Sequence, residues 1–249
     1  MPDTPNFGFH KNPRFSVNHV AEYISTDTAG QRETVIRNAK FPRKPAVVPY
    51  TRSRHSIEAF LAGNSGNLSR LDEDLERLEA HLRREPEGWM KTELRRNIDA
   101  IEAFKKAFTK TRAKRFRFVV GPTDMTMLIG GVRINARLNL TVTETTDAGV
   151  THSGGCTLLI ANTEAARKKI EERRKAVAAL IHWGLQSGGS NIEPLERLCF
   201  SFDVFGLTIT TAPKAIDRLR ANITSACDEA TARWPHVAPP SGYDGPDWH

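Results

Sequence analysis

The sequence is poor in the features that mark disulfide-rich, membrane and secreted proteins. Its 249 residues include only three cysteines, Cys156, Cys199 and Cys227, which lie far apart and form no CxxC pair. That spacing disfavours a disulfide framework and a cysteine zinc site. No apolar run approaches the roughly 18 residues of a membrane span, and the first residues show no apolar core of a secretory signal. We therefore expect a cytoplasmic protein with three buried thiols and no membrane contact.

Motifs of the common enzyme classes are also missing. The pairs Gly130-Gly131 and Gly154-Gly155 have neither the spacing of a phosphate loop nor its Lys-Ser/Thr pair. No GxSxG segment occurs, and none of the eight histidines pairs with another at the spacing of metal ligands. The sequence therefore predicts no cofactor and no metal, and it favours a role without catalysis.

The strongest pattern that is present runs from Gly131 to Ile160. Apolar and polar residues alternate strictly along Val132–Thr143, with arginine, asparagine and threonine on the polar face. This alternation is typical of a strand that rests one face on a core. A turn at Thr146–Gly149 and a second strand at Val150–Ile160 follow it. The segment predicts one long strand paired with the next as an antiparallel hairpin.

The other elements are predicted from periodicity and from capping residues such as Ser16. Together they indicate an α+β protein: a helical N-terminal region with a helical hairpin, then a mainly antiparallel sheet flanked by helices. Three parts are expected, at 1–65, 66–114 and 115–249. Helices are predicted at 17–24, 28–39, 51–63, 68–84, 91–108, 163–185 and 213–234, and further strands at 116–120, 126–129, 199–203 and 207–211.

Leucines at alternating spacings of three and four form a seam along the first helix of the hairpin. Because a second apolar helix follows at once, the seam favours internal pairing of the two helices. The alternative is that the same leucines bind a protein partner or a second copy of the chain. The seam consists of Leu68, Leu71, Leu75, Leu78 and Leu82.

Positive charge is concentrated rather than spread. The formal net charge is +7, and the segment from Lys105 to Arg117 contains no acid. Such a run suits phosphates, although basic residues also stabilise a helix C-terminus. The leading hypothesis is binding of DNA or RNA, or of a nucleic-acid-associated partner, through basic surface. The predicted contacts are Lys105, Lys106, Lys110, Arg112, Lys114, Arg115 and Arg117, supported by Arg133 and Arg137 on the polar face of the long strand.

Three residues near the predicted sheet are candidates for chemistry. Asp203 lies in an apolar strand, where a carboxylate must be exposed, paired or functional. An arginine partner is the simplest explanation for it. A metal-dependent nuclease, with Asp203 and Glu144 holding the ion, is the alternative. His152, on the second strand of the long hairpin, is the one histidine considered for a site, and a lone histidine on a strand is more often structural or solvent-facing.

The order of helix 91–108, strand hairpin 132–160, helix 163–185 and strand 199–204 resembles the core of the PD-(D/E)xK restriction-endonuclease-like superfamily. That resemblance implies an Asp on one strand and a Glu-x-Lys on the next, which hold Mg²⁺ and activate water. In this chain the first strand has Asn139 at the position of the motif's Asp. The second strand, Gly155–Ala161, contains neither the Glu nor the Lys of the motif. The resemblance therefore implies a nuclease-like fold without its catalytic residues.

Overall fold

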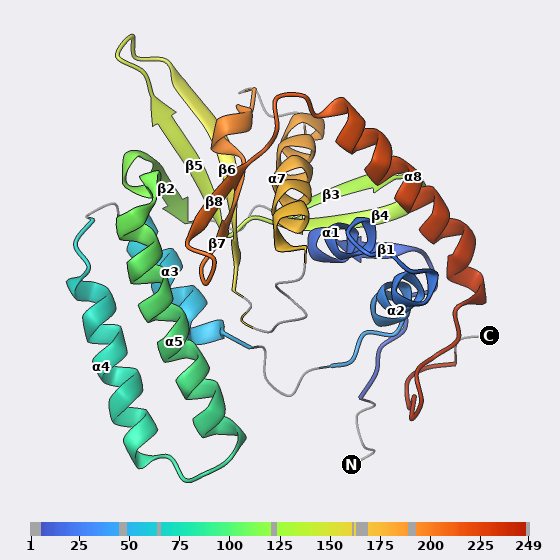
Figure 1. Ribbon diagram of the computed structural model, residues 1–249, viewed down its shortest axis with the longest axis horizontal. Helices are drawn as coiled ribbons and strands as arrows, with labels where there is room; N and C mark the ends of the chain where they lie inside the picture. Colours follow the sequence, from blue (N-terminus) through green and yellow to red (C-terminus); the bar gives the residue numbers. More distant parts are fainter. Residues whose placement is uncertain are drawn as a thin grey trace.

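A computed structural model describes residues 6–44, 49–63, 66–120, 124–160, 162, 169–188 and 193–247. The α+β class is confirmed, because helices dominate the first half of the chain and two sheets flanked by helices follow (Figure 1). Every helix in these ranges is too short or too polar to cross a membrane.

The N-terminal helices begin where the capping residues predict. Ser16 precedes α1 (Val17–Ile24), and its side-chain oxygen accepts a hydrogen bond from the His19 backbone at 3.2 Å. Thr28 caps α2 (Ala29–Lys40) in the same way, and α3 (Thr51–Ala62) follows. The chain before α1 adds a short strand, β1 (Arg14–Ser16), which pairs with a much later strand. Nothing local in the sequence signals that pairing.

The helical hairpin consists of α4 (Ser69–Arg84) and α5 (Trp89–Lys110). Leu71 and Leu78 are buried in one core with residues of α3 and α5. The other seam leucines, Leu68, Leu75 and Leu82, are partly buried against the same core. The seam is therefore used inside the chain, as the internal pairing predicts.

The prediction of one long strand over Val132–Thr143 is wrong, because the chain passes from one sheet to the other near the middle of this segment. β4 (Val132–Arg137) belongs to a sheet of order β1-β4-β3, and β5 (Leu140–Thr145) belongs to a sheet of order β2-β5-β6-β7-β8. Between them, the Asn139 backbone donates to the Cys156 carbonyl at 3.0 Å, and its side-chain oxygen accepts from the Leu158 backbone at 2.8 Å. The alternation continues through the change because each half buries its apolar residues in a different core.

The remaining elements follow the predictions within a few residues, and most strand pairs are antiparallel. β1–β4 and β6–β7 are the parallel pairs. The predicted helix at 163–185 begins partly outside the described residues. The remaining bounds are Arg117–Val120 for β2, Asp124–Ile129 for β3, Thr151–Leu159 for β6, Phe200–Asp203 for β7, Thr208–Thr211 for β8, Ile170–Ser187 for α7 and Asp217–Arg233 for α8, with short 3-10 turns at Arg112–Arg115, Glu196–Leu198 and Trp234–His236.

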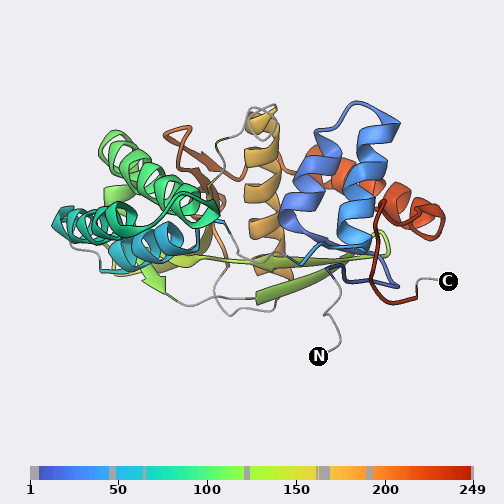
Figure 2. The same ribbon diagram turned by 90° about the horizontal axis from the view of Figure 1, so that it is seen from below.

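Two hydrophobic cores divide the molecule. The first packs the β1-β4-β3 sheet against α1, α2, α7 and α8, and the second packs the five-stranded sheet against α3, α4 and α5. Each core joins residues from before position 65 to residues after position 115. In Figure 2 the helices of the first core all lie on one side of its sheet. Among the residues that the structure describes, no helix or strand covers the opposite face of that sheet.

Gly154 and Gly155 have a packing role at the contact between the cores. A Cβ on Gly155 would lie 2.7 Å from Leu138, so that side chain would have to shift, and it would make a tight contact of 3.1 Å with Ile181. A Cβ on Gly154 would meet the backbone of Leu198. The glycine pair therefore lets β6 approach α7 and its neighbours closely.

Candidate nucleic-acid interface

The uncovered face of the β1-β4-β3 sheet carries three arginines. Arg133 and Arg137 are exposed on β4, while Val132, Ile134 and Ala136 between them are buried. Four residues of strand place the two arginine positions about 13 Å apart. Arg14 of β1 lies directly beside Arg133 in the strand register. We call Arg14, Arg133 and Arg137 the arginine face.

The charges of the arginine face are not neutralised by the protein. None of its three arginines forms an ion pair with a described residue. The Asn135 amide, in the orientation that satisfies its polar atoms, accepts bonds of 2.6 and 3.0 Å from the Arg14 guanidinium. Asp124 lies opposite Arg137 in register but makes no ion pair with it. The face therefore presents positive charge without an ion pair among the described residues, and the exposed Asp124 lies beside one end of it.

A cleft opens beside the arginine face, where the two sheets diverge. Its volume is about 450 Å³, and it lies between α3, the start of α1, β4 and β6. Arg137 belongs to both the face and the cleft. The polar residues that converge on the cleft include Arg54, Glu58, Asn139 and Thr157.

Asn139 organises the polar groups of the cleft. Its amide nitrogen donates to Glu58 Oε1 at 2.7 Å, while its oxygen accepts from the Leu158 backbone. Arg54 Nη1 also approaches that oxygen, at 3.4 Å, and the Leu158 carbonyl at 3.3 Å. Burial lowers the pKa of Arg54, and neighbouring Glu58 opposes that shift. Because the amide oxygen accepts a backbone N–H, the Asn139 side chain is held in one orientation.

The cleft does not suit the Mg²⁺ ion that the superfamily resemblance implies. Mg²⁺ requires near-octahedral oxygen ligands and is usually held by one or two carboxylates. Here the one carboxylate that lines the described cleft, Glu58, already accepts a hydrogen bond from Asn139, and the Asn139 oxygen already faces two donors. No group of three histidine, cysteine or acidic side chains elsewhere in the described residues forms a metal site. An arginine beside these oxygens disfavours a second cation.

The basic run of residues 105–117 forms a separate surface around the end of α5 and the start of β2. Lys105 is ion-paired with Asp72 of α4. Arg115 lies over the Phe116 ring at 4.7 Å, and Lys114 lies 5.8 Å from the Phe108 ring. The side chain of Arg112 is outside the described part. The five exposed cations of the run are called the lysine group. They are Lys106, Lys110, Lys114, Arg115 and Arg117.

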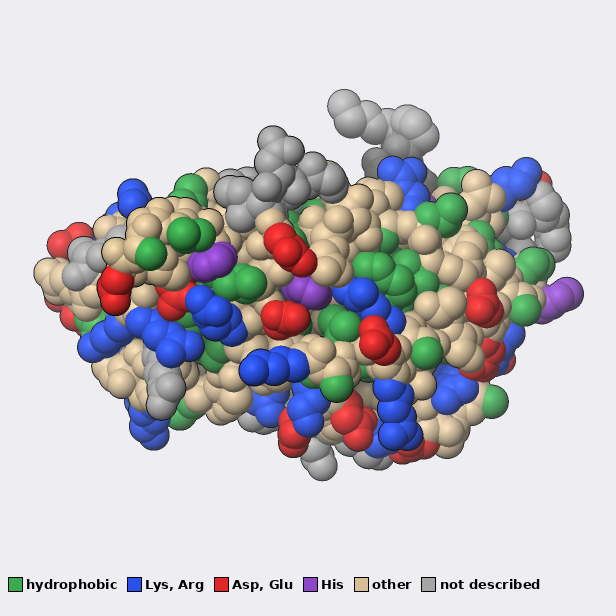
Figure 3. Space-filling model, turned by 90° about the horizontal axis from the view of Figure 1, so that it is seen from above, with side chains coloured by type: hydrophobic (Ala, Val, Ile, Leu, Met, Phe, Trp, Pro, Cys, Tyr) green, Lys and Arg blue, Asp and Glu red, His purple; other side chains and the backbone are tan. Residues whose placement is uncertain are grey.

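The phenylalanines within the basic run belong to the second core. Phe104, Phe108, Phe116 and Phe118 are all buried. They form the apolar side of a groove of about 380 Å³, whose rim includes Lys114, Arg115 and Arg117. Lys and Arg side chains gather on the left of Figure 3, the side of α5 and β2 in Figure 1, with some acidic side chains beside them. The rings support the cations but offer no exposed face to a base.

The structure keeps apart the acids that a nuclease would have to bring together. Glu144 pairs with His152 in the strand register and binds Arg197 at 2.6 Å. Asp203 lies opposite Leu159, seven residues farther along β6, which corresponds to about 23 Å. Asp203 is buried and binds Arg174 at 3.2 Å and the Gly206 backbone at 2.8 Å. These residues stabilise a turn and a strand end, and they do not form a joint site.

The three cysteines are buried and free. Burial raises the pKa of Cys199 and Cys227 to about 12, and it raises the pKa of Cys156 as well. A thiol with a raised pKa carries almost no thiolate at neutral pH and is a poor nucleophile. The cysteines therefore serve packing, as the sequence predicts.

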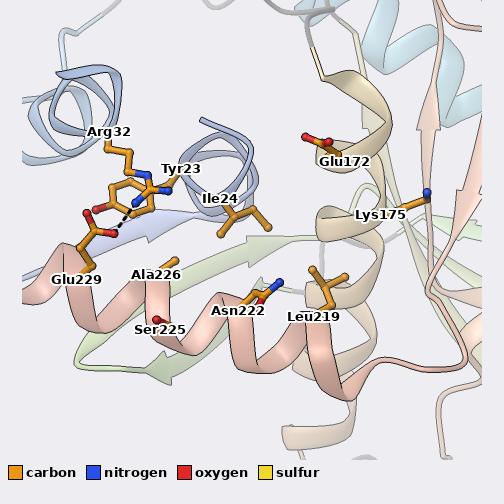
Figure 4. A pocket seen from close by; sticks show the side chains of 10 residues that line it. All are labelled: Tyr23, Ile24, Arg32, Glu172, Lys175, Leu219, Asn222, Ser225, Ala226 and Glu229. Carbon is orange, nitrogen blue, oxygen red and sulfur yellow. Dashed lines mark hydrogen bonds and ion pairs between the residues drawn. The ribbon is translucent and has the colours of Figure 1, made fainter. Parts of the chain in front are cut away.

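A second polar groove, between α1, α2, α7 and α8, has cations that are paired with carboxylates of the chain. Figure 4 shows Arg32 and Glu229 joined across one end of it, at 2.8 Å. Lys175, at the other end, pairs with Glu171 on its own helix at 2.6 Å. Its volume of about 480 Å³ resembles that of the cleft, but its cations already have carboxylate partners.

No protein-family model matches the chain, and no curated protein sequence matches it either. The interface is therefore defined by the geometry of this chain alone. Sequence reasoning identified Arg133 and Arg137 but missed Arg14, Arg54 and Glu58 as members of a site. Arg54 and Glu58 share a face of α3 at a spacing of four residues, a signal that the sequence does contain. No local signal connects Arg14 to β4.

Proposed function

We propose that the protein binds nucleic acid through its phosphate backbone and does not cleave it. The arginine face is the primary contact, and the lysine group is a secondary one. Exposed arginines without acidic partners gain most from phosphate oxygens, which accept two hydrogen bonds from one guanidinium. The single observation that carries the proposal is the set of three exposed arginines, without ion pairs among the described residues, on a sheet face that no described helix covers.

The two surfaces can contact the same ligand. β2 begins at Arg117, on the rim of the groove, and ends at Val120, which lines the cleft. α3 likewise contributes Leu61 to the groove and Arg54 to the cleft, about 10 Å apart along its axis. A backbone that follows β2 and α3 would therefore reach the lysine group from the arginine face.

We propose that the protein does not cleave nucleic acid for two reasons: the cleft has Asn139 instead of an acid, and Glu144 and Asp203 lie far apart. An amide cannot supply the negative charge that a metal ion needs, and Glu58 has no acidic neighbour in the cleft. If the nuclease-like fold suggested by the sequence is correct, the cleft would be a degenerate catalytic site. We also propose a cytoplasmic location. The proposal rests on the composition, with three scattered cysteines and no apolar run of membrane-span length.

Fluorescence anisotropy with a random labelled DNA duplex, titrated from low to physiological salt, tests the proposal. We expect the logarithm of the association constant to fall linearly with the logarithm of salt concentration, by about 0.9 for each phosphate contacted. Mg²⁺ or Mn²⁺ should leave the duplex intact. The absence of binding at low salt would refute nucleic-acid binding, whereas metal-dependent cleavage would refute only the non-catalytic role.

A further inference from the structure

One arginine in the cleft forms no ion pair with a described residue, although the Glu58 carboxylate lies one helical turn away. Arg54 donates from Nη1 to two neutral oxygens, at 3.3 and 3.4 Å. No described residue accepts a hydrogen bond from its Nε or its other terminal nitrogen, and it forms no described ion pair. Glu58, one helical turn away, directs its carboxylate to Asn139 and to His55 instead. A partly buried guanidinium normally has an anion beside it, because burial without one is unfavourable.

The surroundings of Arg54 favour a small anion over a cation. Arg137 lines the same cleft and has no described ion-pair partner, so two arginines face one carboxylate, that of Glu58. Asn135 and Thr157 add polar groups to the wall. A volume of about 450 Å³ is ample for a tetrahedral anion with its bound water.

We infer that this cleft binds a phosphate group, which Arg54 and Arg137 hold from two sides. Guanidinium groups match the geometry of phosphate oxygens and form charge-assisted pairs with them. The phosphate belongs either to a free phosphate ion or monoester or to the end of a nucleic-acid strand on the adjacent arginine face. The inference does not depend on nucleic-acid binding, because the pocket is complete within one chain.

Isothermal titration of the full chain with inorganic phosphate at low ionic strength tests the inference. Phosphate should bind to the unmodified protein, and Arg54→Gln should weaken binding by about tenfold or more. Arg52→Gln is the matched control, because Arg52 is exposed in the first turn of the same helix and does not line the cleft. Glu58→Gln should strengthen binding, because it removes the negative charge while keeping an oxygen for Asn139.

Three results would overturn the inference: no phosphate binding, equal losses for Arg54→Gln and Arg52→Gln, or weaker binding of Glu58→Gln. If Arg54→Gln does not fold, Arg137→Gln, at an exposed position, replaces it and should lose affinity as well. Oligonucleotides with and without a 5′-phosphate separate the two sources. A preference for the phosphorylated strand assigns the end of a nucleic acid, and equal binding assigns the free ion. A failed phosphate titration leaves duplex binding by the arginine face standing.

Discussion

The arginine face and the lysine group are both basic, but they rest on different supports. The arginine face stands on β1 and β4, where each Cα position is fixed by strand pairing. The lysine group stands at the end of α5 and on a short turn, over the buried phenylalanines of the second core. Some of its cations already interact with aromatic rings. The number of positive charges therefore does not by itself decide which surface binds phosphate better, because a planar guanidinium loses less side-chain freedom per hydrogen bond than a flexible lysine.

The largest effect should come from the support of the lysine group. Phe108 is buried and lies in a T-shaped contact with Phe60, with ring centroids 4.9 Å apart. Phe108→Ala should lower the free energy of unfolding by about 3–5 kcal/mol, since it leaves a cavity in the second core. Denaturant titration measures this loss. Phe108→Leu, which keeps most of the volume, is the control and should lose less than half as much; equal losses would show that the ring is not a packing element.

The next largest effect should come from reversing the arginine face. The combined variant Arg14→Glu, Arg133→Glu and Arg137→Glu should weaken duplex binding by about a hundredfold, since three charge-assisted contacts are lost. The salt slope should fall by about one unit per arginine. Anisotropy measures both quantities, and circular dichroism checks that the fold is kept. A change of less than about threefold would place the nucleic acid elsewhere.

Charge reversal of three lysines in the lysine group should weaken duplex binding less than charge reversal of the arginine face. Lys106→Glu, Lys110→Glu and Lys114→Glu change the net charge by the same amount as the arginine variant. Binding should weaken by about tenfold, because flexible lysines gain less per contact. Each triple variant serves as the control for the other. If only the net charge mattered, the two variants would lose the same affinity for the duplex. A larger loss for the lysine variant would make the lysine group the primary contact.

The smallest expected effect is a loss of stability at low pH, caused by His182, which is buried, and His19, which is partly buried. Burial lowers the pKa of His182 and of His19 below 6.5, so the unfolded state binds more protons in the window just below that value. Stability is therefore full above pH 6.5 and should fall as the pH is lowered through the window, by about 1.4 kcal/mol per unit of lowered pKa. Thermal melts across the window measure the fall. His182→Gln should reduce it, whereas His236→Gln, at an exposed position, should not; equal falls would contradict a role for the buried ring.

Much of the secondary structure was predictable because its signals are local. Ser16 and Thr28 cap helices where the sequence places them, and the turn at Thr146–Gly149 closes its hairpin with Gly149 at a φ of +78°. The site was less accessible to sequence reasoning. Lys40 illustrates the limit: it lies in a basic stretch, yet its ammonium group is buried and donates to the carbonyls of Trp234 and Val237, each at 2.9 Å.

The sequence by itself determined the α+β class, the helical hairpin and the alternation that exposes Arg133 and Arg137, because these follow from the periods of helices and strands. Only the tertiary structure decided that the alternating segment divides at Asn139 between two sheets. It also decided that Arg14 lies beside Arg133, that Arg54 faces the resulting cleft, and that Glu144 and Asp203 stay apart. The physical reason is that strand pairing and core packing join residues far apart in the chain, and a local pattern carries no information about its distant partner.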